Sequence, residues 1–198
     1  MIFNFLLEAV LLLVPLVYFK RNGLNAVKEL GLEGKKASSA WKYSLIILGA
    51  MALVSFALAL VFNFFGANDI SKVADVLQAA KSASLFFVFT ITVGVVLEEF
   101  FFRGFLIKFI DRQLWGEKKS QSRRAKARGF LQEYSGVILS SLFFGVLHFG
   151  YGSVSEIIGA VSLGLVLALF FKKYQNLYAN TYAHLLWNAI VIFGAGIA

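Results

Sequence analysis

The stretch VVLEEFFFRGF, residues 95–105, places two glutamates and an arginine in an otherwise apolar segment. Each charged side chain near the centre of a membrane helix costs roughly 2.5–3.5 kcal/mol on insertion scales, so three of them need compensating partners. Glu99 and Arg103 are four residues apart on one helix face, which predicts an ion pair. Glu98 points about 100° away from Glu99, and we expect it to lack this partner and to act as a general base. The alternative is that both glutamates belong to a buried network that only packs helices.

The composition is that of a helical membrane protein. Of the 198 residues 59% are hydrophobic, the mean hydropathy is +0.76, and 15% are charged, compared with about 25% in soluble domains. We therefore predict an all-α, polytopic membrane helical bundle that forms a single transmembrane domain over residues 1–198, with a motif-bearing core at about 82–197. The sequence contains no cysteine, which excludes disulfides, thiol catalysis and cysteine-ligated zinc.

Apolar segments predict about six transmembrane helices. They lie at residues 2–19, 41–65, 82–109, 130–149, 154–171 and 177–197. The third is longer than the roughly 20 residues of a perpendicular crossing, so we expect its end to leave the bilayer. The fifth carries Ala160, Gly164 and Ala168 at every fourth position, a small-residue stripe that favours close packing of helices.

The net charge of +8 is concentrated next to the predicted spans. Sixteen of the nineteen lysines and arginines fall in segments 20–42, 108–128 and 172–173. This distribution is typical of cytoplasmic loops, which places both termini outside. A nucleic-acid partner is not expected, because no folded basic module accompanies the charge. The expected partners are membrane lipid and a membrane-associated protein or peptide, and the sequence favours no oligomeric state.

Both histidines of the chain fall inside apolar spans, next to other polar candidates. His148 follows Phe144 by four residues, and His184 precedes Asn188 by four. Polar groups in a bilayer must find one another or water. Together with Glu98, the two histidines and Asn188 could carry out a hydrolysis by water. Glu98 and His148 would polarise the water molecule. His184 and Asn188 would stabilise the oxyanion that forms.

Two other chemistries are less well supported. The same glutamate and histidines could hold zinc, but the sequence has no His-Glu-x-x-His motif, and we expect neither a metal nor another cofactor. A serine mechanism is not favoured either, since no span carries a Gly-x-Ser-x-Gly elbow or a comparable Ser/Lys pair.

Three short motifs follow one another in a fixed order. They are Glu-Glu-x-x-x-Arg at residues 98–103, Phe-x-x-x-His at 144–148 and His-x-x-x-Asn at 184–188. In this order they resemble the motifs of the CAAX-protease and bacteriocin-processing family, also called the Abi family, of intramembrane glutamic endopeptidases, which includes the type II CAAX prenyl endopeptidases. The resemblance covers residues 95–188, about half of the chain.

The resemblance implies a role for each matching residue. Glu98 with His148 would activate water, and His184 with Asn188 would form the oxyanion hole. The residues that would support this site structurally are Glu99, Arg103 and Phe144.

The resulting hypothesis is an intramembrane endopeptidase in the plasma membrane of a prokaryote, acting on a membrane-associated protein or peptide, with prenylated or lipid-linked substrates included. Three alternatives stay open: a non-catalytic membrane immunity or regulatory protein, a zinc-dependent membrane peptidase, and a transporter or proton relay. The last is disfavoured, because there are only six predicted spans and no inverted repeat is evident.

The depths of the two histidines conflict with this site if the helices are straight. His148 lies at the outer end of its predicted span, whereas His184 lies seven residues from the inner end of its own. Their depths then differ by on the order of 15 Å. We therefore expect the span at 130–149 to begin later, or the span at 154–171 to be partly re-entrant.

Overall fold

The computed structural model describes residues 2–69, 71–73, 75, 92–116 and 129–194, and no strand occurs among them. The first helices are α1 (Ile2–Arg21), the short α2 (Ala26–Glu29) and α3 (Gly34–Phe64). An α-helical segment at 92–98 continues directly into the π-helix η1 (Glu99–Leu106) and α6 (Ile107–Trp115). The chain then forms α7 (Phe130–Leu147), the 3₁₀ turn η3 (His148–Tyr151), α8 (Val154–Tyr174) and α9 (Leu177–Gly194). The predicted all-α membrane bundle is confirmed.

Among the residues that the structure describes, three helical segments are long and apolar enough to cross a membrane: Ala26–Phe64, Gln132–Tyr151 and Val154–Tyr174. They correspond to the second, fourth and fifth predicted spans. The start of the third predicted span lies outside the described residues. The number of six spans therefore stays a prediction.

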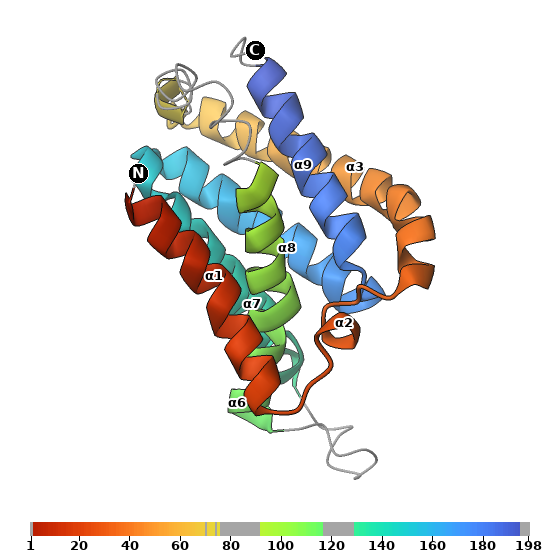
Figure 1. Ribbon diagram of the computed structural model, residues 1–198. Helices are drawn as coiled ribbons and strands as arrows, with labels where there is room; N and C mark the ends of the chain where they lie inside the picture. Colours follow the sequence, from red (N-terminus) through yellow and green to blue (C-terminus); the bar gives the residue numbers. More distant parts are fainter. Residues whose placement is uncertain (1, 70, 74, 76–91, 117–128, 195–198) are drawn as a thin grey trace.

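The π-helix η1 occupies the centre of the bundle. It contacts α1, α7, α8 and α9, and Figure 1 shows the η1 and α6 segment running between the helices that surround it. The most extensive helix pairs are α7 with α8 and α3 with α9. A π-helix, with its wider turns, is rare and is often found at functional sites. Here it begins at the second glutamate of the acidic stretch.

Small residues allow α7 and α8 to approach closely. Ala160 and Ala168 are buried, and a Cβ added to Gly164 would lie 3.1 Å from the Phe144 ring. On the facing helix, a Cβ added to Gly145 would lie 2.2 Å from a methyl group of Val161. The small-residue stripe is thus a packing surface, as its spacing predicts.

The expectation of a shifted or re-entrant helix is wrong. α7 begins at Phe130 and α8 is a continuous helix of 21 residues. Both histidines nevertheless adjoin Phe144, whose ring centroid lies 4.8 Å from that of His148 and 5.8 Å from that of His184. The helices cross at an inclination (Figure 1), so the straight, upright arrangement on which the depth argument depends does not hold.

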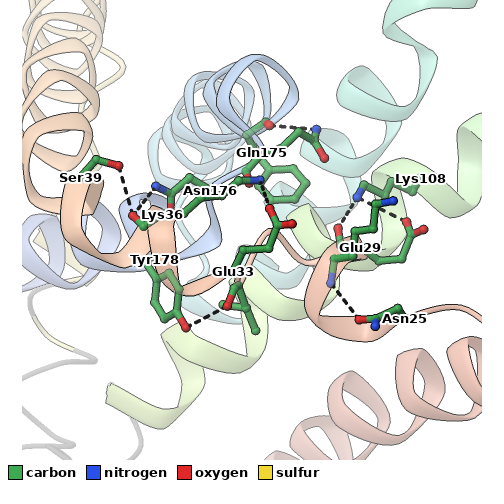
Figure 2. Close-up of polar contacts among 12 residues, drawn as sticks. Asn25, Glu29, Glu33, Lys36, Ser39, Lys108, Gln175, Asn176 and Tyr178 are labelled. Carbon is green, nitrogen blue, oxygen red and sulfur yellow. Dashed lines mark hydrogen bonds and ion pairs between the residues drawn. The ribbon is translucent and has the colours of Figure 1, made fainter.

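Polar contacts fasten the connection between α1 and α3 to the rest of the bundle (Figure 2). The Glu29 carboxylate at the end of α2 forms ion pairs with Arg112 at 3.1 Å and with Lys108 at 3.4 Å. The Lys36 ammonium donates to the backbone carbonyl of Gln175 at 2.7 Å. The ends of α1, α6 and α8 and the starts of α3, α7 and α9 therefore form one end of the bundle, which we call the basic end.

An apolar core fills the half of the bundle next to the basic end. Its buried members are Phe19, Leu30, Phe105, Ile107, Val137, Ala168, Phe171 and Leu177. Phe19, Ile107 and Phe171 directly precede lysines of the basic end in the sequence, so the buried core extends to that end. The opposite half contains a cavity.

Candidate active site

A cavity of about 650 Å³ penetrates the half of the bundle opposite the basic end. Its wall comes from α1, α3, segment 92–98, α7, η3, α8 and α9, and it is largely apolar. Glu98, His148, His184 and Asn188 all line it. The structure therefore brings together the four residues that the sequence proposes for catalysis.

Glu99 lies beneath this cavity and binds two partners through one oxygen. Its side chain is fully buried, with 0% exposure. Its Oε1 atom lies 3.2 Å from Nη1 of Arg103 and 2.9 Å from Nδ1 of His184. The first contact is the ion pair that the four-residue spacing predicts. The second joins η1 to α9, which the spacing along one helix could not indicate.

Aromatic rings complete the surroundings of Arg103. Its Cζ atom lies 4.2 Å from the ring centroid of Phe144 and 5.9 Å from that of Phe102. Its Nε and Nη2 atoms have no hydrogen-bond partner in the described part of the chain. The faces of aromatic rings attract cations, so the Phe144 ring and Glu99 together compensate the buried guanidinium.

Glu98 differs from Glu99 in exposure and in partner. Its side chain is 26% exposed, toward the cavity, and its Oε2 atom lies 3.9 Å from Nε2 of His184. The ion pair of Arg103 that the structure describes is with Glu99, and Glu98 approaches His184 instead. Adjacent glutamates can both reach His184, because an imidazole presents its two nitrogens on different edges of the ring.

His148 is oriented by its own helix. Its Nδ1 atom contacts the Phe144 carbonyl oxygen at 2.9 Å. A carbonyl can only accept, so Nδ1 carries the proton and Nε2 is the acceptor in the neutral ring. The Tyr151 ring stacks on His148 with a centroid separation of 5.9 Å. Phe144 thus contributes its carbonyl to His148 and its ring to Arg103, which accounts for the spacing of the second motif.

Sequence reasoning missed Asn180, which is buried next to the site. Its Nδ2 atom donates to the Leu167 carbonyl at 2.7 Å, and its side chain is a neighbour of Glu99. A signal was available, since Asn180, His184 and Asn188 recur at every fourth position along one face of α9. Other missed residues of the cavity wall are Glu8, Tyr151 and Glu156.

Asp69, in the connection after α3, caps the start of α8. Its carboxylate accepts hydrogen bonds from the Ser153 hydroxyl at 2.8 Å and from the backbone N–H groups of Val154 and Ser155 at 3.0 Å. Lys72 lies 3.3 Å away as an ion-pair partner. These contacts, led by the Ser153 hydroxyl, hold the pKa of the Asp69 carboxyl well below its ordinary value. They also fix the chain directly after η3, which carries His148.

The geometry of the site offers no multidentate metal position among the described residues. No group of three or more histidine, aspartate or glutamate side chains in this part of the chain is arranged to hold a metal ion. His184 also directs its Nδ1 to Glu99. The cavity wall instead offers a carboxylate from Glu98, an imidazole acceptor from His148, a second imidazole from His184 and an amide from Asn188.

Comparison with known proteins agrees with the motifs. Residues 80–190 match a family model described as type II CAAX prenyl endopeptidase, Rce1-like. The match spans more than half of the 198 residues and contains all three motifs, which confirms the family resemblance. No curated protein and no solved structure matches the chain significantly. The apolar helices and the match to a membrane protease family show that the protein is an integral membrane protein.

The Asp69 cap predicts a pH-dependent contribution to stability. Asp69→Asn removes the charge, so the variant should unfold at a lower temperature than the wild type in detergent at pH 7. Because the pKa of Asp69 is lower in the folded state, its charge stabilises the fold fully above the ordinary pKa of about 3.8. This stabilisation is lost as the pH falls through the lowered pKa. The difference in Tm should therefore shrink below about pH 4. Asp75→Asn, at an exposed position, is the control. If Asp69→Asn lowered the Tm equally at every pH, the assignment of Asp69 as a charged cap would be contradicted.

The different surroundings of the two glutamates predict different effects on folding. Glu99→Gln leaves the buried Arg103 charge without its carboxylate, and breaking a buried pair in this way costs about 3–5 kcal/mol. Glu98→Gln changes a partly exposed group of the cavity wall. The yield of folded, monodisperse Glu98→Gln protein in detergent should therefore be close to that of the wild type, and that of Glu99→Gln should be lower. Size-exclusion profiles of the two isosteric variants measure this. Equal yields would refute the structural role of Glu99.

Proposed function

The chain belongs to the type II CAAX prenyl endopeptidase Rce1-like family, and on this premise we propose that it is an intramembrane endopeptidase of the glutamic type. The observation that carries the proposal is the meeting of Glu98, His148, His184 and Asn188 on the wall of one cavity. They approach from segment 92–98, η3 and α9, directly above the buried Glu99.

The substrate is a membrane-associated protein or peptide that carries an apolar group. In support, the cavity wall is largely apolar, and its volume of about 650 Å³ falls within the roughly 300–1,000 Å³ of typical ligand sites. A prenyl or other lipid chain next to the scissile bond would bury its surface there. The polar residues at the bottom of the cavity would meet the peptide bond.

Water activation falls to Glu98 and His148. The Glu98 carboxylate and the Nε2 lone pair of His148 accept the two hydrogens of one water molecule, and Glu98 takes a proton as the water oxygen attacks the carbonyl carbon. The proton held by Glu98 then passes to the leaving nitrogen as the C–N bond breaks. The Phe144 carbonyl keeps His148 in the tautomer that this step requires.

His184 and Asn188 stabilise the oxyanion of the tetrahedral intermediate. Since Nδ1–H of His184 is directed to Glu99, donation from Nε2 requires the doubly protonated ring. Glu99 is therefore a positioning residue, because it orients the ring and compensates its charge. Removal of one oxyanion donor in other enzymes costs about 2.7–4 kcal/mol of transition-state stabilisation.

The enzyme works in the plasma membrane of a prokaryote, with its basic loops in the cytoplasm and without a metal or other cofactor. The grouping of basic residues beside the spans supports this orientation. In the proposed mechanism His184 and Asn188 act as donors rather than as metal ligands, because a metal-bound nitrogen could not donate to the oxyanion; the contact of His184 Nδ1 with Glu99 leaves only Nε2 for this role.

The function is tested by hydrolysis of a peptide library, with and without a prenylated cysteine, by purified protein. Wild type and the control Glu133→Gln, an exposed position on α7, should cleave the same peptides. Glu98→Gln should lose about 10²–10⁴-fold in kcat, the range of general-base catalysis. Asn188→Ala should lose about 10²–10³-fold in kcat as an oxyanion donor.

A chelator should leave the wild-type rate unchanged. Loss of activity with the chelator and its return with stoichiometric zinc would replace the glutamic mechanism by that of a zinc-dependent peptidase. Folded wild-type protein that cleaves no peptide in the library would instead support a non-catalytic immunity or regulatory role.

A further inference from the structure

Polar side chains recur at every fourth position along one face of α9, beginning with the residue before it. They are Asn176, Asn180, His184 and Asn188. Asn176 donates to a backbone carbonyl at the start of α3, and Asn180 donates to one in α8. His184 contacts Glu99 in η1, and Asn188 lines the cavity. The two asparagines therefore hold α9 in the orientation from which the other two residues reach the site.

The Asn180 side chain is held firmly inside the bundle. It is 1% exposed, and its Nδ2 atom donates at 2.7 Å to the carbonyl of Leu167, which is fully buried. Leu167 belongs to α8, which forms one of the most extensive helix pairs of the bundle with α7. A primary amide has two N–H donors, so Asn180 has one more N–H to give beyond the one that Leu167 accepts.

Glu99 has an oxygen that needs such a donor. Its Oε1 atom serves both Arg103 and His184. Its Oε2 atom is buried and has no hydrogen-bond partner in the part of the chain that the structure describes. The Asn180 side chain lies next to this carboxylate. A buried acceptor without a donor is costly, and the interior of a bilayer supplies no water in its place.

We propose that Asn180 is a positioning residue, which donates its second N–H to Oε2 of Glu99 and so fixes how this carboxylate presents Oε1 to His184. A carboxylate that is held at both oxygens cannot turn about its terminal bond. The Nδ1–H group of His184 then keeps one direction, and Nε2 keeps its place beside Glu98. The catalytic benefit of this orientation rests on the proposed function, whereas the anchoring of the ring does not.

The test compares Asn180→Leu with the matched control Asn176→Leu. Leucine is similar in shape to asparagine but carries no hydrogen-bond donor. Both substitutions remove a side-chain hydrogen bond at a buried position, but Asn176 lies one helical turn further from His184 along α9. The chain has two histidines, so the ring signals in the NMR spectrum of histidine-labelled protein in detergent are assigned with a single His148→Gln spectrum.

Asn180→Leu should speed the exchange of the His184 Nδ1–H proton with solvent by about tenfold, the effect of losing one net hydrogen bond. The ring signals of His148 should not change, and Asn176→Leu should leave both rings as in the wild type. Unchanged exchange in Asn180→Leu, or equal acceleration in both variants, would overturn the proposal.

A second variant and the wild type cover the case in which Asn180→Leu does not fold. Asn180→Ala also lacks the donor but adds no bulk, and the same exchange rates are expected for it. In the wild type both side-chain amide protons of Asn180 should exchange slowly. One slow and one fast amide proton would overturn the proposal without any variant.

A peptide cleaved by the wild type adds a kinetic readout. Folded Asn180→Leu should lose about 10–100-fold in kcat, the range for outer partners that orient metal-binding histidines, with KM close to that of the wild type. Asn176→Leu should keep the wild-type kcat. A wild-type kcat in Asn180→Leu would overturn the proposal. If the wild type cleaves no peptide, the proposed function fails, and the exchange rates still decide whether Asn180 anchors His184.

Discussion

The structure depends on one buried oxygen, Oε1 of Glu99, which binds both Arg103 and His184. In a bilayer no water is available to solvate a lone charge, so each of these groups needs the others. The carboxylate connects the central π-helix to α9, and the guanidinium extends the connection to the Phe144 ring on α7. Three elements that are distant in sequence are therefore held together by a charge network rather than by apolar packing alone.

This network lies at the boundary between two unlike halves of the bundle. On one side an apolar core and the Glu29 ion pairs close the basic end. On the other side the helices leave a cavity, and the polar groups above Glu99 face it. The close approach of α7 and α8 at Gly145 and Gly164 brings Phe144 to the boundary, where its ring and carbonyl serve two different residues. The buried network below thus supports the residues of the proposed site rigidly, and the cavity above them leaves room for a substrate.

Sequence periodicity predicted what lies on one helix and failed on what lies between helices. Hydropathy predicted the bundle, and the spacing of Glu99 and Arg103 predicted their ion pair. The spacing of residues along one helix could not predict that His184 contacts both glutamates, because this contact depends on how α9 packs against η1. The depth argument failed since it assumed upright helices. The Asp69 cap was missed because it joins residues 84 positions or more apart, without a local motif.

A double-mutant cycle of Glu99→Gln and Arg103→Met in reversible unfolding tests the central claim most directly. Each single substitution breaks the buried Glu99–Arg103 pair by removing one partner, at a cost of about 3–5 kcal/mol, whereas the double variant removes both charged groups of this pair. The double variant should therefore lose less free energy of unfolding than the sum of the single losses, with a coupling of about 0.5–3 kcal/mol. Additive losses would contradict the claim, since they would mean that the two residues stabilise the bundle independently.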